Sequence, residues 1–208
     1  SAEKILSVIE KEYGDIRKGK AWKIEKKCLV ISGLGSMPSY NIEDIPWTDK
    51  QDQIQTITLM RGVKEIANFA FFGLSKLATV ELNEDLNKIG GGAFMGCTQL
   101  KSITIPDSVT HLGASAFENC SNLRAVTLSL NIKELRNWAF FKCSKLQSIN
   151  FEGINSIGED VFDGTNIFLQ SKSKTTEDSE VVRGICRVYL NEFRMEYLDR
   201  VQYLLNCV

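Results

Sequence analysis

Three consecutive segments of the chain share one pattern: LATVELNEDLNKIGGGAFMGCTQ from Leu77, LKSITIPDSVTHLGASAFENCSN from Leu100 and LRAVTLSLNIKELRNWAFFKCSK from Leu123. Each copy spans 23 residues, begins with Leu, continues with an apolar-x-apolar triplet and closes with Ala-Phe and a Cys. Self-similarity at such a period is typical of a solenoid, in which stacked units bury one continuous core. These segments therefore predict the fold, although they do not identify a ligand.

The repeat extends in both directions from these segments. A first unit begins at Ile54 and a fifth unit, one residue shorter, begins at Leu146, so five units occupy residues 54–168. Leu74 in the first unit and Thr165 in the fifth stand where the three middle units carry Cys. Stable stacking needs about three or more such units, so five are sufficient.

Within a unit, the residues predict two short strands and a bend. Val80-Glu81-Leu82 alternates apolar and polar residues, and its equivalents should form parallel strands about 4.8 Å apart. A second apolar pair predicts a shorter strand, and Gly-x-x-Ala-Phe then predicts a tight bend with Ala at an inner corner. The Phe of this bend is expected to form the spine of the core. It recurs at Phe71, Phe94, Phe117, Phe140 and Phe162.

The segments outside the units predict caps, because the open ends of a solenoid expose core and strand edges. Residues 1–53 combine a short amphipathic helix over residues 3–13 with two strand-like runs near Trp22 and Cys28. Residues 169–208 combine a polar loop, a strand over residues 186–190 and an amphipathic helix that begins at Asn191. We therefore expect one domain over residues 1–208, of the α+β class and rich in β-structure.

The composition argues against several kinds of partner. The chain has 25 Lys and Arg and 26 Asp and Glu, so it lacks the basic footprint of a nucleic-acid-binding protein. No apolar run approaches the roughly 18 residues of a membrane helix, and no signal segment opens the chain. We expect a monomer with no cofactor, no nucleic-acid partner and no membrane insertion.

The repeat resembles the BspA-type leucine-rich repeat, whose unit is close to LxxIxIPxxVTxIGxxAFxxCxxL. The third unit matches it at Leu100, Ile103, Ile105, Pro106, Val109, Thr110, Gly113, Ala116, Phe117, Cys120 and Leu123. The lead-in is also similar, at Leu29, Ile31, Ser32, Gly33, Gly35, Met37 and Pro38, followed by Pro46-Trp47. The resemblance implies a right-handed leucine-rich-repeat solenoid. It also implies a secreted or cell-surface bacterial protein for binding and adhesion, with no shared catalytic residues.

Three cysteines occupy one ladder position in adjacent units, namely Cys97, Cys120 and Cys143. Ladder neighbours lie about 5 Å apart, a distance that permits a disulfide. The Leu and Thr at this position in the outer units instead favour buried free thiols. A metal site is disfavoured because the chain has no Cys-x-x-Cys and a single His. In the caps, a disulfide between Cys186 and Cys207 is possible, and the sequence does not decide whether it forms.

Candidate catalytic groups are few, and we predict that the chain is not an enzyme. His111 is the only histidine, and its position between Thr110 and Leu112 is typical of an exposed side chain. Gly90-Gly91-Gly92 resembles part of a phosphate-binding loop, but Gly90 matches the bend of the repeat and no Lys-Ser/Thr follows.

The outward positions of the predicted strands are the candidate binding face. One column contains Thr58, Glu81, Thr104, Thr127 and Asn150. Short hydroxyl side chains on a flat sheet could bind a protein or glycan surface, but they are also ordinary solvent-facing strand residues. Beside the bend, a second strip is partly apolar and is either a contact site or a packed edge. It contains Phe72, Met95, Glu118, Phe141 and Asp163, and Trp138 precedes it.

Two hypotheses of function follow from the sequence. The first is a non-catalytic module that binds a protein or a glycan. The alternative is a structural or assembly domain that packs on another chain or domain through its terminal helices.

Overall fold

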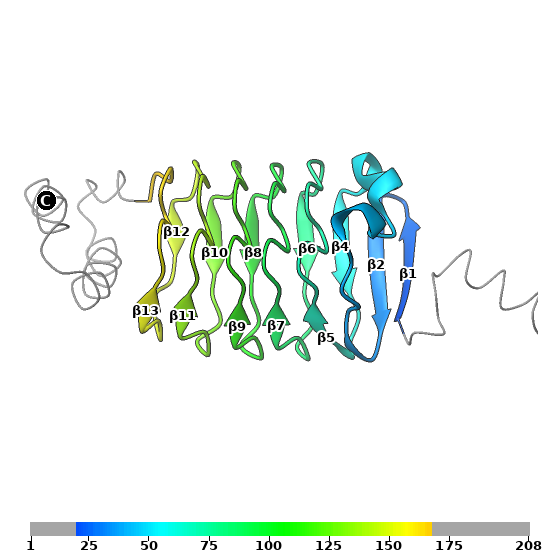
Figure 1. Ribbon diagram of the computed structural model, residues 1–208, viewed down its shortest axis with the longest axis horizontal. Helices are drawn as coiled ribbons and strands as arrows, with labels where there is room; N and C mark the ends of the chain where they lie inside the picture. The colour runs from blue at the N-terminus through cyan, green and yellow to red at the C-terminus, as the bar shows by residue number, and fades with distance from the viewer. Residues whose placement is uncertain (1–19, 168–208) are drawn as a thin grey trace, which may run out of the picture.

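The computed structural model describes residues 20–167, in which two files of short strands run along one axis (Figure 1). The first file contains β2 (Cys28–Gly33), β4 (Thr56–Leu59), β6 (Thr79–Glu81), β8 (Ser102–Thr104), β10 (Ala125–Thr127) and β12 (Ser148–Ile149). Paired neighbours in this file are parallel, and from β4 onward they lie one unit apart, as in Thr56 with Thr79. The alternating pattern buries one side of each strand, for example Ile57 and Ile103.

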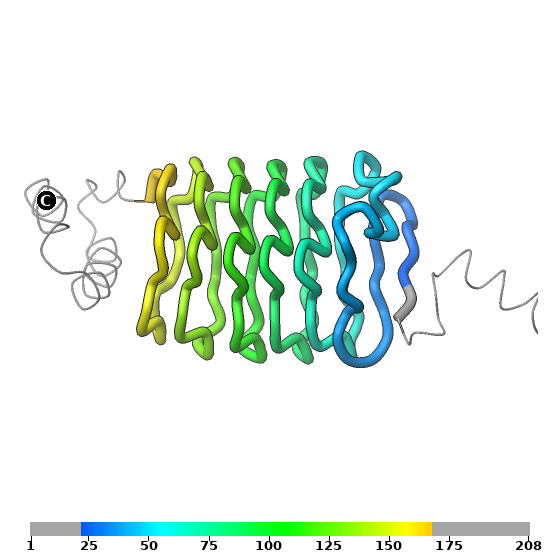
Figure 2. The backbone as a smooth tube through the Cα atoms, viewed as in Figure 1, coloured from blue at the N-terminus to red at the C-terminus, as the bar shows by residue number. Residues whose placement is uncertain are grey.

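The second file follows the first within every unit. It contains β3 (Gly35–Ser36), β5 (Val63–Ile66), β7 (Lys88–Ile89), β9 (His111–Leu112), β11 (Glu134–Leu135) and β13 (Ser156–Ile157). Its inward side chains, such as Ile89 and Leu135, are fully buried. Figure 2 shows the same backbone path repeated turn after turn, as the 23-residue period predicts.

Each file contains one interruption of its hydrogen-bonded ladder. The first file divides into β1-β2-β4-β6 and β8-β10-β12, and the second into β3-β5-β7-β9 and β11-β13. Within residues 20–167, no strand pairing joins β6 to β8 or β9 to β11. The chain therefore winds continuously from unit to unit, but the strand hydrogen bonding is interrupted at two places.

The bend forms the third side of each turn and supplies the core with its aromatic ladder. Phe117 stacks between Phe94 and Phe140, with ring centroids 5.3 and 5.5 Å apart and planes within 2°. The backbone also links the units here, because Phe94 N donates to Ala116 O at 2.8 Å. The predicted Phe spine is confirmed.

The N-terminal cap continues this ladder. β1 (Lys20–Glu25) pairs antiparallel with β2, and two 3-10 helices follow, η2 (Ile42–Asp44) and η3 (Thr48–Gln53). Between them, Trp47 is 1% exposed, stacks on Phe71 at 5.7 Å and donates its indole N–H to Ala70 O at 3.0 Å. Trp47 thus covers the first ring of the ladder.

Three predicted elements of the caps lie outside the described residues. These are the helix over residues 3–13, the strand over residues 186–190 and the helix from Asn191. The described part of the chain contains strands and the two 3-10 helices but no α-helix. The α share of the expected α+β class thus concerns only those terminal segments.

Candidate binding site

The residues predicted on the strand face lie in one row across the solvent side of the first file. They are Thr58 in β4, Glu81 in β6, Thr104 in β8, Thr127 in β10 and Asn150, which follows β12. Thr58 Oγ1 donates to Glu81 Oε2 at 2.9 Å. The Asn150 side chain pairs with the backbone N–H and C=O of Leu128 at 2.6 and 3.1 Å. The remaining hydroxyl groups, in β8 and β10, are exposed.

A shallow cavity of about 410 Å³ lies on this face where the ladder between β6 and β8 is interrupted. Its lining includes Glu81, Glu84 and Thr104. Val80 and Leu82 of this unit are half-buried, whereas their equivalents in the neighbouring units are buried. At this interruption the strand face therefore exposes polar side chains together with part of two apolar ones.

The other interruption, between β9 and β11, coincides with a change of residue in the bend. A Cβ on Gly90 would lie 2.6 Å from the Ala67 carbonyl carbon, and a Cβ on Gly113 would collide with the backbone of Gly90 and Gly91. These contacts show that neighbouring units approach each other closely at this position. The fourth unit carries Arg136 instead of Gly. We attribute the separation of β11 from β9 to the Arg136 side chain.

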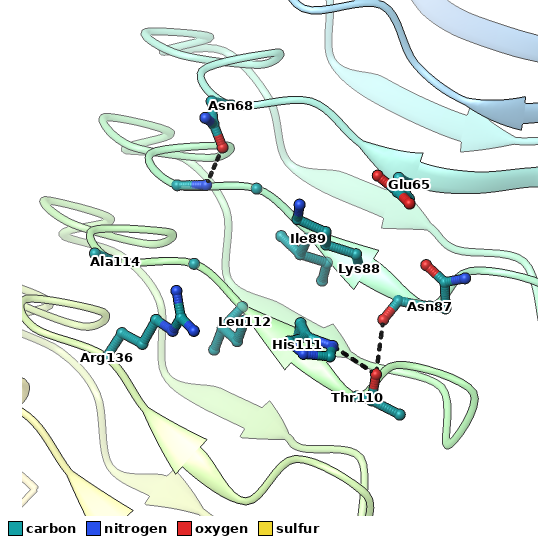
Figure 3. A pocket seen from close by; sticks show the side chains of 13 residues that line it. Glu65, Asn68, Asn87, Lys88, Ile89, Thr110, His111, Leu112, Ala114 and Arg136 are labelled. Carbon is teal, nitrogen blue, oxygen red and sulfur yellow. Dashed lines mark hydrogen bonds between the residues drawn. The ribbon is translucent and has the colours of Figure 1, made fainter.

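A polar groove of about 620 Å³ lies on the second file over β7 and β9, with Arg136 as its one lining residue from the fourth unit. Glu65, Lys88, His111 and Arg136 line it, and Figure 3 shows them on successive turns. His111 Nδ1 lies 2.7 Å from Thr110 Oγ1, and among residues 20–167 no carboxylate pairs with this ring. The groove thus contains charged side chains of both signs, and no carboxylate of the described residues orients the His111 ring.

One backbone position of the bend is left-handed in every unit. Its φ values are +56° at Phe69, +59° at Gly92, +55° at Ser115, +59° at Trp138 and +51° at Asp160. Gly and Asp tolerate this region, whereas a bulky side chain there is an outlier that costs about 1–3 kcal/mol. Two aromatic residues therefore occupy positions that the backbone disfavours.

A corner hollow of about 600 Å³ lies between these two aromatic rings. The floor of the hollow is formed by small residues, because Gly92 and Ser115 occupy the left-handed position in the two intervening units. Phe69 leans over Gly92, and Trp138 is 40% exposed. The full lining is Asn68, Phe69, Gly91, Gly92, Met95, Ala114, Ser115, Glu118, Trp138 and Phe141. Asn68, Gly91 and Ala114 also line the polar groove, so the two depressions form one continuous surface.

The structure divides the partly apolar strip that the sequence indicated. Met95, Glu118 and Phe141 line the corner hollow, whereas Phe72 packs edge-on against Phe69 at 6.3 Å. Asp163 does not line the hollow. Sequence reasoning missed Phe69, although the Gly, Ser and Asp at equivalent positions were a signal that this position is left-handed.

The thiol ladder is buried and free, as predicted. The Cys97, Cys120 and Cys143 thiols donate to carbonyl oxygens of bend Phe residues at 3.3, 3.1 and 3.0 Å. Burial raises the pKa of the Cys97 and Cys120 thiols, which therefore stay protonated. Cys28 is also free, and Cys186 and Cys207 lie outside the described residues. Among the described residues, no three His, Cys, Asp or Glu side chains converge on a metal position.

None of the helices in the described part of the chain has the length and hydrophobicity to cross a bilayer. A search of curated proteins found no match. Among solved structures, a leucine-rich repeat protein of T. pallidum is 20% identical, with a TM-score of 0.51 over 86% of this chain and 96% of its own. A leucine-rich cell surface protein of Faecalibacterium prausnitzii is 22% identical, with a TM-score of 0.55 over 72% of this chain and 46% of its own. Such identities establish a shared fold alone.

The repeat units themselves match a known family. The BspA type leucine rich repeat region matches residues 48–168 in six copies, which is more than half of the 208 residues. These residues carry the strands from β4 to β13, the bend and the Phe ladder. This chain belongs to the BspA-type leucine-rich repeat family.

Proposed function

We propose that this protein is a non-catalytic binding module that recognises a protein or a glycan through the polar groove and the corner hollow. The observation that carries the proposal is the placement of Phe69 and Trp138 at left-handed positions beside the hollow. Neither ring belongs to the central ladder, which Phe71 and its equivalents form. Backbone strain of this kind is typically kept where function benefits from it.

The strand face is the second candidate surface. Its exposed Thr104 and Thr127 hydroxyls lie beside the cavity at the β6–β8 interruption, and they could donate and accept hydrogen bonds with a flat partner. Among the described residues, this face has no exposed aromatic side chain, the kind of group that usually dominates binding energy. We therefore rank it below the corner hollow.

We also propose that the protein is secreted or displayed on a bacterial cell surface. Membership of the BspA-type family supports this compartment, and one structural neighbour is described as a cell surface protein. Antibody labelling of intact and permeabilised producing cells would test it. Labelling that requires permeabilisation would contradict a surface location.

The binding surface can be tested with two variants of the full chain. Phe69→Ser/Trp138→Ser introduces the residue that the third unit carries at this position, and Thr104→Lys/Thr127→Lys alters the strand face. Each would be applied with wild type to arrays of extracellular proteins and of glycans. We expect ligands of the wild type to be lost with the serine variant and kept with the lysine variant. The opposite result would assign binding to the strand face.

The assembly hypothesis predicts a different result. It places the function in terminal segments outside the described residues, so deletion of residues 1–19 should convert an oligomer into a monomer. Light scattering of both forms would measure this. An oligomer that depends on residues 1–19, with no array ligand, would favour assembly over the binding module.

A further inference from the structure

We propose that the corner hollow receives the cationic side chain of an arginine or lysine of a protein partner, between Phe69 and Trp138 and against Glu118. The inference rests on the proposed function and names the chemistry of the occupant. Three features of the site support it: its dimensions, the single ionisable residue in its lining, and the hydrogen bonds that its backbone amides already make.

The hollow has the length of an extended side chain with its flanking residues. Phe69 and Trp138 belong to the first and fourth units, so their backbone positions are about 14 Å apart at the usual strand spacing. Gly92 and Ser115 leave the floor between them low. The aliphatic stem of Arg or Lys can cover such an apolar floor while its charged end reaches a polar group.

The charge of the lining complements a cation. Glu118 is the one ionisable residue among the lining residues, and within residues 20–167 no cation is paired with its carboxylate. One cation of the protein itself, Lys142, lies beside the hollow, with its Nζ 4.9 Å from the centroid of the lining residue Phe141. The exposed Trp138 ring could accept a second cation, and Trp is the most favourable ring for this contact.

The backbone of the floor cannot extend a partner's strand. Gly92 N already donates to Ala114 O at 2.9 Å, and Ser115 N donates to Asn137 O at 3.0 Å. Recognition must therefore use side chains. A neutral sugar could stack on the rings, but it would supply no charge to Glu118.

The adjacent polar groove adds positive charge next to the hollow. Lys88 and Arg136 outnumber Glu65 among its charged lining residues, although Arg136 Nε also lies 3.3 Å from Glu134 Oε2. An acidic residue near the partner's cation would therefore face a cationic groove (Figure 3). The combined surface suits a peptide segment that carries both signs of charge.

The test uses blocked pentapeptides with Arg, Lys, Gln or Glu between two valines, titrated into the ¹⁵N-labelled full chain. The reporter is the Trp138 indole N–H, which donates to Asp160 Oδ2 at 3.3 Å and is assigned through its loss in Trp138→Ser. We expect binding in the order Arg, Lys, Gln, with the Glu peptide weakest. Glu118→Gln should weaken Arg-peptide binding by about fivefold or more, because one partly desolvated ion pair is removed. Glu152→Gln, at an exposed position outside both depressions, should leave it unchanged.

The inference would be overturned if the Gln peptide bound as tightly as the Arg peptide, or if Glu118→Gln had no effect. Stronger binding of cellotetraose, as a neutral sugar, would likewise overturn it in favour of a glycan. These outcomes are separate from failure of the binding module. Array ligands that are lost with Phe69→Ser/Trp138→Ser but not with Glu118→Gln would keep the module and reject the cationic occupant.

Discussion

Replacing one ring of the aromatic ladder should reveal how much of the stability depends on stacking between units. Phe117 is fully buried, and its ring lies 5.3 Å from Phe94 and 5.5 Å from Phe140. Phe117→Ala removes this buried area and leaves a cavity between two rings that cannot approach each other without moving two units. We expect a loss of about 3–5 kcal/mol in the free energy of unfolding. Phe141, in the fourth unit, is half-buried at the corner, so Phe141→Ala should cost only about 1 kcal/mol.

Urea unfolding, followed by far-UV circular dichroism, would measure both variants against the wild type. Phe141→Ala is the matched control, because it removes the same side chain from a solvent-accessible site. Equal losses for the two variants would refute the ladder as the spine of the core. A loss below about 1.5 kcal/mol for Phe117→Ala would refute it as well.

Three further predictions concern the bend, the thiols and the strand face. Arg136→Gly should allow β11 to pair with β9, because Gly at this position permits close approach. Hydrogen exchange should then slow at the amides of residues 133 and 136, the equivalents of Thr110 and Gly113, which bond to the preceding unit. Unchanged exchange would contradict the role assigned to Arg136. Burial raises the pKa of Cys97 and Cys120 above the ordinary value of 9.0, so the folded state retains protons that the unfolded state releases. The stability that these two thiols contribute should be complete below about pH 9 and fall above it by roughly 1 kcal/mol per pH unit for each thiol. Urea unfolding at pH 8 and pH 10 should show a smaller decline for Cys97→Ala/Cys120→Ala, and equal declines would count against this linkage. Asn150→Ala should lower the free energy of unfolding by about 1–2 kcal/mol in thermal or urea unfolding, because Leu128 loses two hydrogen bonds. An unchanged midpoint would show that these hydrogen bonds do not contribute to stability.

For one residue of the strand face, Asn150, the sequence does not show whether the side chain is free to bind a ligand. The sequence correctly places Asn150 on the outward side of its unit, but nothing in the order of residues shows that its amide is bonded to Leu128. That bond depends on the position of the preceding unit, 22 residues earlier in the chain. A polar side chain in an outward column is therefore not automatically available to a ligand.

The sequence by itself determined the repeat, the burial of the Phe ladder and the packing role of the cysteines. These follow from spacing, because every unit must bury the same positions against its neighbours to complete a core. The tertiary structure decided where the stack opens and where a ligand could bind. Phe69 and Trp138 are 69 residues apart and share a hollow only because the units between them stack and carry small residues at the same left-handed position. The absence of a bend Gly at Arg136 is visible in the sequence, but its consequence depends on how closely two backbones approach.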